Sequence, residues 1–164
     1  MTPFVIGSTL FVFSLLIYTL ISIGYVYPAL NKIQWDRALV PYLLIQCFRF
    51  MPLALLMPGQ VSIAFPVIAA EILAYGHFIS ALFALLAVTL VWHKIRGGRV
   101  AVWLFSLIGL SDMLLAFVTG ISFGVMNIPV GSALFIVTVY MTMVIVSHVL
   151  ILVILFKTRT NSKS

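Results

Sequence analysis

The chain has 164 residues, of which 64% are hydrophobic and 7% are charged, and its formal net charge is +6. A soluble domain carries about a quarter charged residues, so this composition excludes an ordinary soluble globular protein. The length allows one domain. The basic residues stand in short links between apolar stretches, a pattern that excludes a nucleic-acid-binding surface. The sequence therefore predicts an integral membrane protein.

Charged residues and Pro/Gly clusters divide the chain into apolar stretches that we expect to be transmembrane helices. Each is long enough to cross about 30 Å of hydrocarbon at 1.5 Å per residue, and lipid leaves the backbone no partner except the helix itself. The predicted fold is all-α, a polytopic transmembrane bundle of five helices that forms one domain over residues 1–156, followed by a short basic cytoplasmic tail over residues 157–164. The predicted spans are about 4–27, 38–57, 62–92, 100–125 and 130–156.

The basic residues predict the orientation of this bundle. With five spans, the first link, the third link and the tail share one side of the membrane, and the N-terminus and the other two links share the opposite side. The first side carries every Lys and Arg except Arg49: Lys32, Arg37, Lys94, Arg96, Arg99, Lys157, Arg159 and Lys163. Because cytoplasmic loops are rich in Lys and Arg, we expect the N-terminus outside and the C-terminus inside, in the inner (cytoplasmic) membrane of a bacterial cell.

Three charged residues lie inside the predicted spans at similar depths. Counted at 1.5 Å per residue from the predicted span ends, Arg49, Glu71 and Asp112 all fall roughly 12–14 Å below the outer surface. A charge in hydrocarbon must be compensated, so we expect Arg49 to face the bundle interior and to pair with Glu71, Asp112 or both. One arginine beside two carboxylates leaves a negative charge, which a proton, a histidinium or a bound cation would balance.

Other polar residues are expected close to this layer. Gln46 precedes Arg49 by one turn on nearly the same face. Pro52 bends the helix and frees a carbonyl near residue 48. His77 and His148 are predicted just below the charged layer. The candidate ligand- or ion-binding residues are therefore Arg49, Glu71, Asp112, Gln46, His148 and His77.

The sequence predicts no dedicated metal site, because it lacks His-x-x-x-His, Cys-x-x-Cys and paired carboxylates at ligand spacing. We expect no cofactor either, and a haem held between His77 and His148 is the alternative. The expected partner is the lipid bilayer. A small ligand or ion, another membrane protein and a second copy of the chain are further candidates, and no nucleic acid is expected.

The stretches IQCFRF, FPVIAAE, LIGLSDMLLAFVTG and SHVLILVILF follow one another in this order. Their order resembles a widespread group of small, uncharacterised bacterial multi-pass membrane proteins, which have a Gln-x-x-Arg helix, a Pro followed by an acidic helix, a Gly-Leu-x-Asp helix and a late His. The resemblance covers about residues 38–156 and supports a site there, but it implies no activity. The matching positions are Gln46, Arg49, Pro66, Glu71, Gly109, Asp112 and His148.

Three classes of function stay open at this point. The first is a small membrane protein that uses the Arg49, Glu71 and Asp112 layer to bind or pass a proton, a cation or a small ligand. The second is an accessory or partner subunit whose buried charges only fix helix packing. The third, which we expect least, is a membrane-embedded enzyme acting on lipid or quinone, with a histidine and an acid as general base and acid.

Overall fold

A computed structural model describes residues 2–30 and 32–161. All regular secondary structure in these residues is helical, and five helices are long and apolar enough to cross a membrane. This confirms the predicted all-α chain with five such helices. They cover Phe4–Ala29, Trp35–Leu56, Val67–Trp92, Gly98–Ser122 and Ala133–Lys157. Residues 162–164 of the predicted tail, including Lys163, lie outside the described residues.

Three of the five long helices change their winding along their length. Two contain a π-helical turn, and one ends in a 3-10 helix. In chain order the elements are α1 (Pro3–Ile21), the π-helix η1 (Ser22–Val26), α2 (Tyr27–Leu30), α3 (Trp35–Cys47), the 3-10 helix η2 (Phe48–Leu56), α4 (Val67–Trp92), α5 (Gly98–Ser122), the 3-10 turn η3 (Val125–Asn127), α6 (Ala133–Phe135), the π-helix η4 (Ile136–Tyr140) and α7 (Met141–Asn161).

The predicted bounds of the third, fourth and fifth spans were wrong by several residues. The third helix begins at Val67 and not near residue 62, because Pro66 has an extended backbone conformation (φ −63°, ψ 123°) and precedes the first helical residue. α5 ends at Ser122, and Gly124 just beyond it has a left-handed φ of 60°. α7 continues to Asn161, so part of the predicted tail is helical.

The second long helix changes from α to 3-10 winding at Phe48, one residue before Arg49. Pro52 lies inside the 3-10 stretch and has no N–H to donate to a preceding carbonyl. The stretch has nine residues, whereas 3-10 helices rarely exceed four. The predicted local disturbance at Pro52 is therefore a change of helical winding.

Four of the long helices form the body of the bundle. α4 packs against α3, η2 and α5, while α7 packs against α3. α4 turns a face of small residues inward, which lets neighbouring backbones approach closely. The buried small residues of this face are Ala69, Ala70, Ala74, Ser80, Ala81, Ala84 and Ala87.

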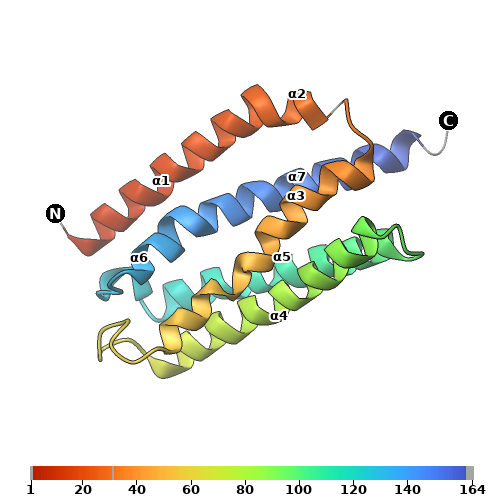
Figure 1. Cartoon of the computed structure of the whole chain (residues 1–164). Helices are drawn as coiled ribbons and strands as arrows, with labels where there is room; N and C mark the ends of the chain where they lie inside the picture. Colours follow the sequence, from red (N-terminus) through yellow and green to blue (C-terminus); the bar gives the residue numbers. More distant parts are fainter. Residues whose placement is uncertain (1, 31, 162–164) are drawn as a thin grey trace.

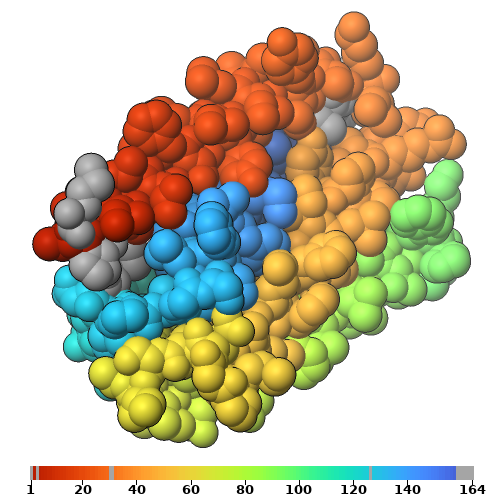
Figure 2. All heavy atoms as spheres, turned by 60° about the vertical axis from the view of Figure 1, so that its left-hand side comes forward, coloured from red at the N-terminus to blue at the C-terminus, as the bar shows by residue number. Residues whose placement is uncertain are grey.

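The first long helix lies at the edge of this body. α1 packs mainly against α7 and η4, and in Figure 1 it runs beside α7 on the side away from α4 and α5. Figure 2 shows residues around 130–140 (blue) between α1 (red) and the segment near residue 60 (yellow). Most of the large apolar side chains of α1 are exposed, among them Phe13 (63%) and Leu20 (67%).

The interior consists of two apolar clusters, one toward each end of the bundle. One contains Leu39, Leu43, Val102, Phe105 and Ile151. The other is built from residues of other parts of the same helices and their loops: Leu55, Phe65, Ala69, Ala70, Val125, Val130 and Ala133. Along α3–η2, α4 and the last long helix, buried polar side chains lie between the residues of the two clusters. The bundle therefore has a polar layer between two apolar layers.

Side-chain contacts identify which chain segments share an end of the bundle. Arg99, in the first turn of α5, lies over the Trp35 ring with its guanidinium carbon 5.9 Å from the ring centroid, and its Nη2 donates to the Leu155 carbonyl at 3.3 Å. Lys157 Nζ lies 5.7 Å from the centroid of the Tyr27 ring. The link between the first two long helices, the start of α5 and the end of α7 therefore meet at one end.

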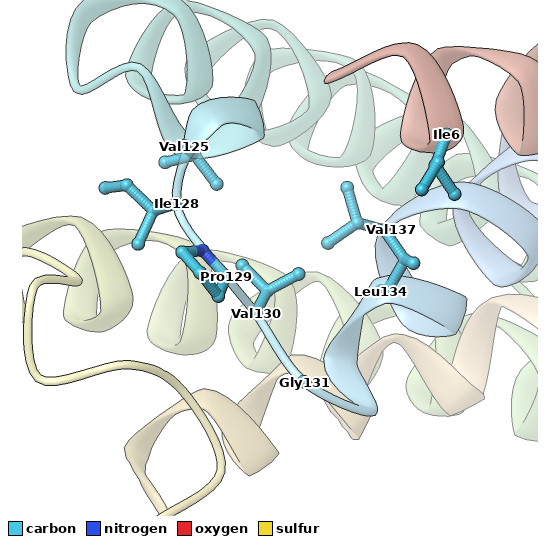
Figure 3. Close-up of a pocket in the computed structure, with 8 residues that line it drawn as sticks. All are labelled: Ile6, Val125, Ile128, Pro129, Val130, Gly131, Leu134 and Val137. Atoms are coloured by element: carbon cyan, nitrogen blue, oxygen red, sulfur yellow. The ribbon is translucent and has the colours of Figure 1, made fainter. Parts of the chain in front are cut away.

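The loops at the other end of the bundle form a small apolar cavity. The Ser62 N–H donates to the Pro129 carbonyl at 3.2 Å, so residues near 60 and near 130 lie together there. The cavity has a volume of about 220 Å³, and Figure 3 shows Ile6 from α1 facing the segment that follows α5. It is lined by Ile6, Val125, Ile128, Pro129, Val130, Gly131, Leu134 and Val137.

Candidate functional site

Asp112 is the centre of the buried polar layer. It lies near the middle of α5 and is 8% exposed. Its Oδ2 accepts hydrogen bonds from Arg49 Nη2 at 2.6 Å and from Ser80 Oγ at 3.1 Å, and it lies 2.5 Å from His77 Nδ1. One carboxylate oxygen therefore binds side chains of η2 and α4 to α5.

Arg49 connects this carboxylate to the other side of the layer. Its side chain is fully buried, and Nη2 also donates to the Gly109 carbonyl at 3.1 Å. Nη1 donates to Gln46 Oε1 at 3.2 Å, and Gln46 Nε2 in turn donates to the Val144 carbonyl at 2.9 Å and to Ser147 Oγ at 2.8 Å. The hydrogen bonds of Arg49 and Gln46 thus reach α5 and α7.

We call the residues joined by these bonds the polar cluster: Gln46, Arg49, His77, Ser80, Asp112 and Ser147. The charges of Arg49 and Asp112 cancel within it. Burying such a pair costs solvation free energy, which is recovered only with close geometry and further hydrogen bonds. Two further hydrogen bonds are present here: Ser80 donates to Asp112, and Arg49 donates to Gln46. His77 adds an imidazole ring beside the carboxylate.

Two glycines make room for the cluster. A Cβ atom at Gly76 would lie 2.6 Å from Asp112 Oδ1. A Cβ atom at Gly109 would lie 2.8 Å from Arg49 Nη1 and 2.9 Å from His148 Cε1. All three distances are too short for a carbon contact, so a Cβ atom at Gly76 or Gly109 would displace the side chains of Asp112, Arg49 or His148.

His148 borders the cluster from α7. Its side chain is 1% exposed, and its ring centroid lies 5.3 Å from that of Phe105. Its Cε1 faces Gly109 on the same side as Arg49. His77 reaches the cluster from α4 at the level of Asp112, and not below it as predicted. The absence of a cofactor stays a prediction, with a haem between the two histidines as its alternative.

Glu71 does not belong to the cluster, which corrects the prediction that it shares a layer with Arg49. It is exposed on α4, and within residues 2–30 and 32–161 the carboxylate of Asp112 pairs with Arg49 and contacts the imidazole of His77. The predicted depth counted from residue 62, but α4 begins at Val67, so Glu71 lies about 6 Å into the helix. The same shift brings His77 to the level of Asp112. Arg49 therefore faces one carboxylate, and the expected surplus negative charge is absent.

Of the six predicted site residues, the structure joins Arg49, Asp112, Gln46 and His77 by hydrogen bonds, places His148 beside them and leaves Glu71 outside. Sequence reasoning missed the serines. Ser80 follows His77 by three residues and so shares its helix face. Ser106, Gly109 and Asp112 repeat at the same spacing on α5. This small-and-polar spacing was the available signal.

A family described as a domain of unknown function (DUF8737) matches residues 6–156. The chain belongs to this family. The matched residues contain the whole polar cluster and nearly all of the five long helices. No curated protein and no solved structure matches the chain.

The glycine at position 109 can be tested against another glycine on the same helix. We expect Gly109→Ala to destabilise the protein by about 1–3 kcal/mol, the usual cost of overpacking, because the new methyl group displaces Arg49 or His148. At Gly120 an added Cβ has no atom within 4 Å. Gly120→Ala should leave stability unchanged or raise it by up to about 1 kcal/mol. Unfolding in mixed detergent micelles measures both, and equal effects would contradict the proposed role of Gly109.

The Arg49–Asp112 pair can be tested by neutralising one partner and then both. Arg49→Met leaves a buried carboxylate without its cation, and we expect a loss of about 3–5 kcal/mol of unfolding free energy. Adding Asp112→Asn removes that charge and should recover part of the loss. The control is Arg37→Ala, an exposed arginine on α3, and a double variant no more stable than Arg49→Met would contradict the pairing.

Proposed function

We propose that this chain is an integral membrane protein whose polar cluster binds a proton and passes it through the bundle. The observation that carries the proposal is the buried triad at Asp112 Oδ2, with Arg49 at 2.6 Å and His77 at 2.5 Å. Ionisable side chains inside apolar helices are costly, and in membrane proteins they commonly mark ion or proton pathways.

The charges of the cluster favour a proton over a metal cation. Asp112 is already matched by the guanidinium of Arg49, and its Oδ2 already has three polar neighbours. A metal cation would have to approach past a fixed positive charge, whereas a proton can be taken up by the imidazole of His77 without displacing any group. The histidine–carboxylate contact is therefore the feature that we assign to proton binding.

A second candidate function is that of an accessory subunit in which the charges only specify packing. Two observations favour it. The cluster joins α3, η2, α4, α5 and α7 by hydrogen bonds, and α1 exposes apolar side chains over most of its length. A buried ion pair that only fixes helix partners is well known. Proton passage is the property that separates the two candidates.

We further propose that the five long helices cross the bacterial inner membrane with the N-terminus outside and the C-terminus in the cytoplasm. The support is the distribution of charge. Basic residues of the first link, of the α4–α5 turn and of the end of α7 gather at one end of the bundle, where Arg99 contacts Trp35 and Lys157 contacts Tyr27. Lys and Arg are enriched on the cytoplasmic side of membrane proteins.

Proton passage is tested in liposomes that contain the purified protein, a pH-sensitive dye inside and valinomycin with potassium to compensate charge. Wild-type protein should collapse an imposed pH gradient faster than empty liposomes do. Asp112→Asn and His77→Gln should both reduce the rate to that of empty liposomes, because each removes a partner of the histidine–carboxylate contact.

The matched control for this experiment is Glu71→Gln, which neutralises the exposed carboxylate of α4 and should keep the wild-type rate. Thermal melts check that each variant is folded. A folded Asp112→Asn protein with the wild-type rate would overturn the proposal. A wild-type rate equal to that of empty liposomes would favour the accessory-subunit function.

The orientation is tested with reporters fused to the C-terminus in bacterial cells. A fluorescent protein that matures only in the cytoplasm should be bright there, and alkaline phosphatase, which is active only in the periplasm, should be inactive. Alkaline phosphatase fused after residue 60, in the loop between the second and third long helices, should be active. The reverse pattern of activities would show that the orientation is inverted.

A further inference from the structure

Beside the polar cluster, four buried polar atoms have no hydrogen-bond partner within residues 2–30 and 32–161. They are Arg49 Nε, Ser106 Oγ and both ring nitrogens of His148. The three residues are at most 1% exposed. Buried polar atoms in folded proteins are almost always hydrogen-bonded, to protein or to ordered water. This group of atoms therefore needs an explanation beyond the cluster itself.

The three side chains come from three helices and converge on one face of α5. Ser106 and Gly109 are three residues apart on α5 and so lie on the same side of that helix. The position of a Cβ at Gly109 is within 3 Å of both Arg49 Nη1 and His148 Cε1. Phe105, next to Ser106, packs against the His148 ring. The residues that carry the unpartnered atoms, on η2, α5 and α7, thus lie around the same part of α5.

We propose that a bound water molecule occupies the site formed by Arg49, Ser106 and His148. The site offers N–H donors from the arginine and the imidazole, a serine hydroxyl that can donate or accept, and an acceptor nitrogen on neutral histidine. A single water can bond the arginine N–H, the serine hydroxyl and one of the two ring nitrogens of His148, and a buried water typically makes about three such bonds. The charge of Arg49 is matched by Asp112, so a neutral guest suits the site better than an anion.

This site extends the polar cluster to α7. The water joins His148 to Arg49, and through Arg49 to Asp112 and Gln46. The water makes Ser106 a binding residue. Gly109 serves the same site, because its missing side chain lets Arg49 and His148 approach each other. The inference stands on the unpartnered atoms and holds whether or not the cluster carries a proton.

The test is NMR of the full-length protein in lipid nanodiscs, with ¹⁵N-labelled histidine. The chain has three histidines, so replacing each of them in turn assigns every ring signal. We expect a magnetisation-transfer cross-peak between water and the His148 ring in the wild type. Ser106→Val replaces the hydroxyl with a methyl group and adds a second methyl on Cβ, so it should remove that cross-peak and shift the ring ¹⁵N signals of His148.

The control is Ser111→Val on the same helix, because Ser111 is exposed and its hydroxyl donates to the Leu107 carbonyl at 3.0 Å. It should leave the cross-peak intact. The absence of a His148 cross-peak in the wild type would overturn the proposal, as would its persistence in folded Ser106→Val protein. Adding chloride or formate should not change the His148 signals, and a saturable shift would mean that the guest is an anion and not water.

Discussion

The bundle depends on how the guanidinium of Arg49 is held without solvent. A buried arginine needs an anion and acceptors for its N–H groups, or it costs more than the remaining packing can offset. Three acceptors meet this need: the carboxylate of Asp112, the backbone carbonyl of Gly109 and the side-chain amide oxygen of Gln46. Asp112 and Gly109 belong to α5, and Gln46 belongs to α3 and bonds in turn to α7. Satisfying one side chain therefore constrains the rotation of α3 and α5 directly, and that of α7 through Gln46.

The rest of the interior follows from that requirement. The two apolar clusters lie on either side of the polar layer, so apolar side chains separate the ion pair from both ends of the bundle. Gly76 and Gly109 allow the backbones of α4 and α5 to approach the charged groups, and the small residues of α4 keep its neighbours close. α1 takes no part in the cluster, which accords with its position at the edge and its exposed apolar surface.

The position of Glu71 changes the chemistry that the layer can perform. Two carboxylates beside one arginine would carry a surplus negative charge, whereas the charge of one carboxylate is already matched by the arginine. The distinction depends on where α4 begins. Pro66 delays the start of the helix to Val67, and this moves Glu71 toward the helix end and brings His77 level with Asp112.

The sequence by itself determined the helical class, the five apolar segments and the concentration of basic residues at alternate links, because composition and segment length decide these properties. It also indicated that Arg49 needs an acidic partner and that Gln46 lies beside it, since both follow from local spacing and the cost of a buried charge. Only the tertiary structure selected Asp112 over Glu71 and added Ser80, Ser106 and Ser147. Those choices depend on helix starts and on rotation about each helix axis, which packing between distant segments decides and which no local pattern of residues contains.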